Sequence, residues 1–146
     1  MSQEAPLTET VNLSIVDDDD LVRKALKRLI SCSGYHIETY ASAEEFLNSG
    51  DPETRHCLIL DIRMPGLSGL ELQRYLRNKN SRLPIIFISS HADEASKTEA
   101  MNAGAVDFLA KPFKEEQLLA AIQKALRLMT GAEFQNSDLP AQSLPA

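Results

Sequence analysis

Short apolar runs alternate with amphipathic segments along most of this chain, and this alternation restricts its possible folds more than any other feature. Five strand-then-helix units in a row predict an α/β fold, in which a doubly wound, five-stranded parallel sheet carries helices on both faces. The predicted strands are 11–16, 35–40, 57–60, 84–88 and 105–109, and the predicted helices begin near residues 21, 43, 68, 93 and 114, the last ending near Met129.

Local signals support the order of these elements. The runs 57–60 and 84–88 are apolar throughout, as is typical of parallel strands buried on both faces. Ser42 and Glu45 form a capping-box pattern that places Ser42 at a helix N-cap. The acidic run Asp17–Asp20 stands at the start of the first helix, where the helix dipole favours negative charge.

Length and charge exclude several classes of protein. A chain of 146 residues predicts one domain, here 11–129, with a flexible N-terminal arm at 1–10 and a linker-like or disordered tail at 130–146. The net charge of -6 disfavours direct binding to nucleic acid. We expect a cytoplasmic protein that does not bind membranes, because no apolar run reaches the roughly 18–20 residues of a membrane helix and no secretory signal is present.

Charged and hydroxyl side chains follow the predicted strands where each one ends. Asp17 and Asp18 follow the first strand, Asp61 the third, Ser89 the fourth and Lys111 the fifth. Ligands of parallel sheets bind beyond these carboxyl ends, so the residues are expected to converge. Two carboxylates about 4 Å apart repel by roughly 4 kcal/mol at an effective dielectric constant of 20. The cluster therefore predicts a site for Mg²⁺ (or Mn²⁺), at which a carboxylate can accept a phosphoryl group.

Three separated segments carry a resemblance to a known family. Residues 16–18 (VDD), 60–69 (LDIRMPGLSG) and 110–113 (AKPF) resemble the signature segments of the receiver domain of two-component response regulators, in particular FixJ/NarL-type regulators. The resemblance covers about residues 10–129. It implies a flavodoxin-like (βα)5 fold.

The same resemblance implies a role for each acidic residue. Asp61 is the phosphoacceptor and takes its phosphoryl group from a phosphohistidine of a sensor histidine kinase. Asp18, Asp61 and the backbone carbonyl of Arg63 ligate the metal, and Asp17 orients a water ligand. The bond between Lys111 and Pro112 is expected to be cis, which proline makes accessible at about 0.5–1 kcal/mol.

Further residues are implied to bind the phosphoryl group or to respond to it. Ser89 and Lys111 match the residues that bind phosphoryl oxygens. Phe108 matches the aromatic residue that turns inward when the domain is phosphorylated. Arg63 and His91 match positions that tune the rate of phosphate loss. Without the resemblance, Phe108 is an ordinary core aromatic, Lys111 an exposed loop residue and Asp17–Asp20 an acidic helix start.

Three functions remain open at this point. The first is the regulatory part of a transcription factor, which contacts DNA only through a domain absent from this chain and forms a homodimer on phosphorylation through the last two helices and the fifth strand. The second is a stand-alone receiver that docks on another protein; neither is an enzyme beyond its own phosphorylation and dephosphorylation. The third is a phosphohydrolase with an aspartate nucleophile, although such enzymes usually carry a second aspartate where this chain has Arg63.

The predicted helix at 93–102 has little to bury. Only Ala95, Ala100 and Met101 are expected to anchor it, so we expect a marginal helix held by its neighbours.

Overall fold

The computed structural model describes residues 11–91 and 93–138, and the predicted arm at 1–10 lies outside them. Its five strands form one parallel sheet in the order β2-β1-β3-β4-β5, which confirms the predicted flavodoxin-like class. The strands are β1 (Asn12–Val16), β2 (His36–Tyr40), β3 (Cys57–Asp61), β4 (Ile85–Ser89) and β5 (Asp107–Ala110). The helices are α2 (Asp20–Cys32), α3 (Ala43–Leu47), α4 (Gly69–Asn78), α5 (Glu94–Asn102) and α6 (Glu115–Asp138), with a short 3-10 helix, η1, at Pro52–Thr54.

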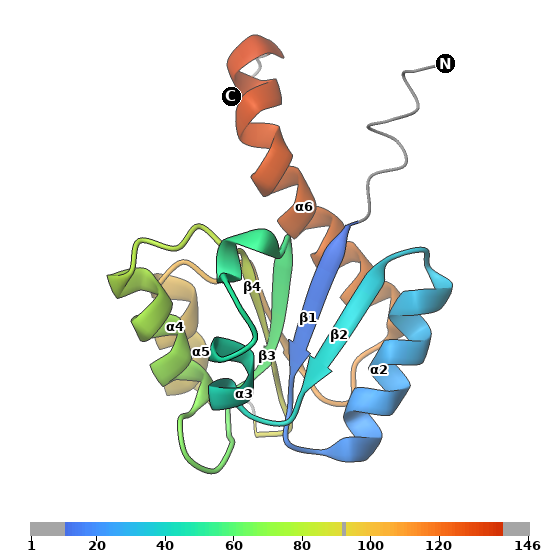
Figure 1. Cartoon of the computed structure of the whole chain (residues 1–146), viewed down its shortest axis with the longest axis vertical. Coiled ribbons are helices and arrows are strands. Elements are labelled where there is room, and N and C mark those ends of the chain that lie inside the picture. The colour runs from blue at the N-terminus through green and yellow to red at the C-terminus, as the bar shows by residue number, and fades with distance from the viewer. Residues whose placement is uncertain (1–10, 92, 139–146) are drawn as a thin grey trace.

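Helices cover both faces of the sheet (Figure 1). Helices α2 and α6 pack on one face, where Ile30 and Ile122 join the alternate strand residues Leu13 and Ile59 in one core cluster. Helices α3, α4 and α5 pack on the other face and form a second core cluster. Every residue of β3 and of β4 is buried, which explains why these strands are apolar up to their last residues, Asp61 and Ser89.

The helix starts follow the predicted caps with one difference. Asp19 caps α2 and accepts the backbone N–H of Leu21 at 2.9 Å, so the acidic run divides into two residues before the cap, the cap itself, and Asp20 in the first turn of the helix. Ser42 caps α3 as predicted, but Glu45 accepts the N–H of Ala41 rather than that of Ser42. The predicted capping box is therefore half formed.

Helix α6 is longer than the sequence pattern predicts. It continues past Met129 to Asp138, so the first part of the predicted tail 130–146 is helical, while residues 139–146 lie outside the described part of the chain. Between Thr130 and Asp138 only Gly131 strongly disfavours a helix, at about 1 kcal/mol, and the first proline is Pro140. In Figure 1, α6 extends beyond the end of the sheet at which the strands begin.

Helix α5 is anchored mainly by polar contacts. Of its residues only Ala100 is buried, whereas the expected anchors Ala95 and Met101 are exposed, because they lie on faces turned away from the sheet. The buried side chain of Gln73, in α4, donates a hydrogen bond of 3.0 Å to the carbonyl of Ala100. Helix α5 therefore depends on its neighbour α4, as expected for a marginal helix.

We expect the amide protons of α5 to exchange with solvent at least about tenfold faster than those of α4, because α5 buries so little apolar surface. Hydrogen exchange followed by mass spectrometry measures both helices in one experiment. The substitution Gln73→Leu removes the bond to Ala100 and is expected to widen the difference. Equal protection of the two helices in the unchanged protein contradicts this prediction.

No helix in residues 11–91 and 93–138 combines the length and the apolar character needed to cross a membrane.

Candidate functional site

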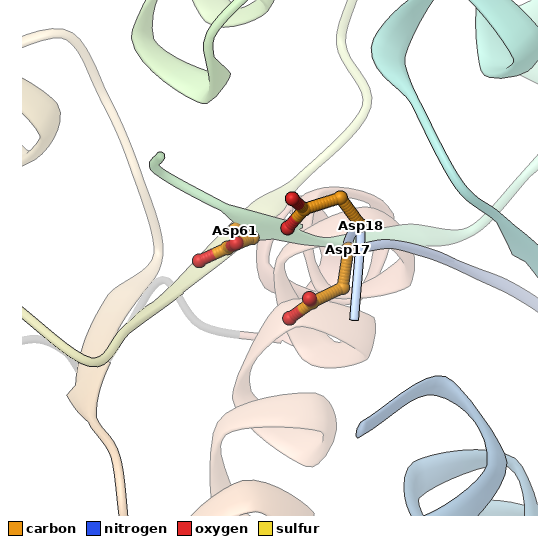
Figure 2. Close-up of side chains that lie close together, drawn as sticks. All are labelled: Asp17, Asp18 and Asp61. Atoms are coloured by element: carbon orange, nitrogen blue, oxygen red, sulfur yellow. The ribbon is translucent and has the colours of Figure 1, made fainter. Parts of the chain in front are cut away.

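Three aspartate side chains meet where β1 and β3 end. The two strands are neighbours, and Val16 pairs with Leu60, so Asp17 and Asp61 occupy adjacent positions at the same edge of the sheet. One carboxylate oxygen from each of Asp17, Asp18 and Asp61 lies within 4.8 Å of the others. Figure 2 shows the three carboxylates pointing to one side, around a common space. The predicted convergence of these residues is confirmed.

Hydrogen bonds hold both the backbone and the side chain of Asp17. The backbone N–H of Asp17 donates to the carbonyl of Tyr40, and Oδ1 of Asp17 accepts the N–H of Asp19 at 2.9 Å. The guanidinium of Arg23 donates to the Asp17 carbonyl at 2.8 Å. Three hydrogen bonds therefore fix the position of Asp17. This residue is also fully buried, whereas Asp18 is exposed.

Lys111 is the cation that faces the aspartates. Its Nζ lies 2.9 Å from Oδ2 of Asp17 and 3.7 Å from Oδ1 of Asp61. Its backbone N–H donates to the carbonyl of Ser89 at 2.7 Å, which ties the end of β5 to the end of β4. The bond between Lys111 and Pro112 is cis, as expected.

The charges of this cluster do not balance. Burial, and after it the neighbouring carboxylate of Asp17, raise the pKa of Asp61 to about 7, against the opposing effect of the Lys111 ammonium. One ammonium compensates only one of the three carboxylates. Hard oxygen ligands with uncompensated negative charge fit a divalent cation such as Mg²⁺ or Mn²⁺.

Gly69 is a site residue for which the sequence pattern predicts no role. A Cβ at this position would lie 2.3 Å from the carbonyl oxygen of Asp61, so only glycine fits here. The N–H of Gly69 donates to the carbonyl of Ile62 at 2.9 Å. This close approach connects the first turn of α4 to the end of β3. The signals of Gly69 in the sequence are its position directly after Ser68 and its place at the end of the segment 60–69 that resembles the receiver family.

The side chains of Ser89 and Arg63 contact the loop between β4 and α5. The Ser89 hydroxyl donates to the carbonyl of His91 at 2.9 Å and accepts the His91 N–H at 3.0 Å, so the backbone of this loop engages it. The guanidinium of Arg63 lies 3.5 Å from the carboxylate of Asp93, which caps α5. Phe108 is buried, with its ring centroid 6.4 Å from that of Phe87.

The residues of this cluster lie in a region that matches a known protein family. The model of the response regulator receiver domain matches residues 13–123, which contain the three aspartates and Lys111. The chain belongs to this family. It is therefore a receiver domain rather than a catalytic enzyme, which removes the phosphohydrolase alternative.

The similar curated proteins include response regulators and transcriptional regulatory proteins. The response regulator protein TodT of Pseudomonas putida is 47% identical over 129 residues, which are 88% of this chain and 56% of TodT. The transcriptional regulatory protein FixJ of Azorhizobium caulinodans is 39% identical over 120 residues, which are 82% of this chain and 57% of FixJ. The chain thus spans about half the length of the curated relatives it matches.

Two solved structures are similar to this chain in both fold and sequence. The response regulator StyR is 42% identical with a TM-score of 0.78, over 88% of this chain and 67% of the StyR chain. FixJ-N is 37% identical with a TM-score of 0.74, over 82% of this chain and 96% of that structure. The predicted similarity to FixJ-type receivers is confirmed.

Proposed function

We propose that Asp61 accepts a phosphoryl group from a phosphohistidine of a sensor histidine kinase, in the presence of Mg²⁺ or Mn²⁺. The observation that carries this proposal is the cluster of three carboxylates and one lysine at the strand ends of a receiver domain. Asp61 combines burial with a carboxylate that faces this cluster. A buried carboxylate beside other carboxylates serves no packing purpose.

The acidic residues would hold the metal in defined roles. Asp18, Asp61 and the backbone carbonyl of Arg63 would ligate it directly, and Asp17 through a water. Bound there, the ion would supply positive charge that offsets the negative charge on the incoming phosphoryl oxygens. The raised pKa of Asp61 supports this assignment, since a nearby cation favours the ionised carboxylate that the transfer needs.

The transfer itself makes one bond and breaks one. A carboxylate oxygen of Asp61 attacks the phosphorus, and a P–O bond forms while the P–N bond to the histidine of the kinase breaks. The bonding electron pair leaves with the imidazole nitrogen. Lys111 then shifts from its contact with Asp17 toward a phosphoryl oxygen, and the distance of 3.7 Å between its Nζ and Oδ1 of Asp61 supports this role.

The hydroxyl of Ser89 responds to the new group. To donate to a phosphoryl oxygen it must give up the hydrogen bond that it donates to the carbonyl of His91. The loop between β4 and α5 then loses this contact next to a marginal helix, and Phe108 in the adjacent strand adjusts its packing. Arg63 and His91, which flank Asp61 and Ser89, tune the lifetime of the phosphorylated state.

We propose that the output is transcriptional and that the protein is cytoplasmic. The support for a transcriptional output is the similarity to FixJ, a transcriptional regulatory protein that extends well beyond the matched region. DNA would be contacted by a part of the protein outside this chain.

Phosphorylation would favour a homodimer through α5, β5 and α6. A stand-alone receiver that docks on another protein is the alternative, and the length of the native reading frame separates the two.

Incubation with acetyl phosphate and Mg²⁺, followed by intact-mass measurement, tests the proposed function. The protein is expected to gain the mass of one phosphoryl group, and Asp61→Asn is expected to gain none. Asp20→Asn is the matched control, because it removes an exposed carboxylate in the first turn of α2 and leaves the cluster intact. An unmodified wild-type protein overturns the proposal.

A further inference from the structure

The loop between β3 and α4, residues 62–68, begins directly after Asp61 and carries the carbonyl of Arg63. Its course therefore decides where that carbonyl lies relative to the aspartates. Two contacts within the β3–α4 unit hold the end of the loop. The N–H of Gly69 donates to the carbonyl of Ile62, and Ser68 and Glu71 form a complete capping box.

A side chain from outside this unit also contacts the loop. Oε2 of Glu44, in α3, accepts the backbone N–H of Leu67 at 3.2 Å. A Cβ on Gly66 would lie 3.0 Å from the same oxygen, so the carboxylate lies directly against the loop at Gly66. Gly66 has a φ of 76°, a conformation that favours glycine.

The backbone that carries Glu44 is well anchored. Its neighbour Ala43 and the nearby Phe46 are fully buried in the second core cluster. The hydroxyl of Ser42 caps the helix by accepting the N–H of Glu45 at 3.0 Å. Although the side chain of Glu44 is exposed, it starts from a fixed backbone and ends on the loop.

We infer that Glu44 is a positioning residue for the phosphorylation site. By accepting the Leu67 N–H it holds the loop 62–68, and through the loop it holds the Arg63 carbonyl in place for the metal. This inference rests on the proposed function, because the role of the carbonyl belongs to that proposal. Glu44 acts through the loop and not on the reacting atoms.

The negative charge of Glu44 offers a second way to favour a cation, and substitutions separate the two effects. Glu44→Gln removes the charge but keeps an oxygen that can accept the Leu67 N–H. Glu44→Asp keeps the charge but is shorter by one methylene group and is expected not to reach Leu67. A positioning role thus predicts that the Gln variant resembles the wild type and the Asp variant does not.

Titration with Mg²⁺ alone measures the metal affinity of each variant. The titration is monitored through the amide NMR signals of Asp17, Asp18 and Asp61. Loss of one hydrogen bond is expected to raise the Kd for Mg²⁺ about three- to tenfold in Glu44→Ala and Glu44→Asp. In Glu44→Gln the Kd is expected to stay within about twofold of the wild type. The Leu67 amide signal is expected to shift in the first two variants.

Glu45→Ala is the matched control, because it removes the neighbouring charge of α3 while its own contact is with the N–H of Ala41. Its Kd for Mg²⁺ is expected to equal that of the wild type. Two results overturn the inference: an unchanged Kd in Glu44→Asp, or a Gln variant as weak as the Ala variant. Failure of the wild type to accept phosphate from acetyl phosphate would instead refute the proposed function, and the Mg²⁺ titration reports separately on Glu44.

Discussion

The substitution Gly69→Ala is expected to lower the free energy of unfolding by about 3 kcal/mol or more. The added Cβ would lie 2.3 Å from the carbonyl oxygen of Asp61 and 3.0 Å from Cα of Ile62. Both neighbours are backbone atoms at the end of a strand that is buried on both faces, so they cannot move aside cheaply. Urea denaturation followed by circular dichroism measures the change.

The effect of Gly69→Ala has a matched control in Gly34→Ala. Gly34 has a φ of 96°, and a Cβ added there would meet no atom within 4 Å, so alanine costs only the conformational strain of about 1–2 kcal/mol. The Gly69 variant is also expected to bind Mg²⁺ more weakly, since the contact displaces Asp61, whereas the Gly34 variant keeps its affinity. Equal stability of the two variants rules out the steric explanation.

At pH 8 without divalent cations, Asp61→Asn is expected to be more stable than the wild type by about 2–4 kcal/mol. Folding raises the pKa of Asp61 from 3.8 to about 7, because the folded protein buries the carboxyl group beside Asp17. The folded state therefore binds this proton more tightly than the unfolded state. The contribution of Asp61 to the free energy of unfolding is favourable at low pH and falls as the pH rises from about 4 to about 7.

Urea denaturation in the presence of EDTA at pH 4.5, 6 and 8 measures this dependence on pH. The difference between Asp61→Asn and the wild type is expected to be largest at pH 8 and small at pH 4.5. Adding Mg²⁺ at pH 8 is expected to stabilise the wild type more than the variant, since binding to the folded state adds to its stability. Asp20→Asn serves again as the control with an exposed carboxylate. A wild type that is more stable than Asp61→Asn at pH 8 without metal contradicts a raised pKa of Asp61.

Much of the fold follows from patterns that each element carries alone. The unbroken apolar runs at β3 and β4 predict strands buried on both faces, and the helical spacing between the strands predicts the layers. The meeting of Asp17, Asp18 and Asp61 also follows, because parallel strands end at one edge of the sheet. Lys111 belongs to the same group for the same reason.

Other features depend on contacts between separate elements, which the hydrophobic pattern of each element does not predict. The close approach of Gly69 to Asp61 requires the exact path of the chain from β3 to α4. The contact between Glu44 and Leu67 joins two elements 23 residues apart. The anchoring of α5 by Gln73 replaces the apolar contacts that its sequence lacks.

The length of α6 and the hydrogen bonds of Ser89 are likewise decided by the folded structure and not by the sequence pattern. The apolar spacing that predicts α6 stops near Met129, but the helix continues to Asp138, and the first proline in this part of the sequence is Pro140. The hydroxyl of Ser89 bonds to the backbone of His91, a choice between competing partners in space. Hydrophobic periodicity is a local property, so the amino-acid order was sufficient for the strands, the layers and the acidic edge. Side-chain orientation and close backbone contacts arise only when the packed elements compete for the same volume and the same hydrogen bonds, and the folded arrangement alone decides them.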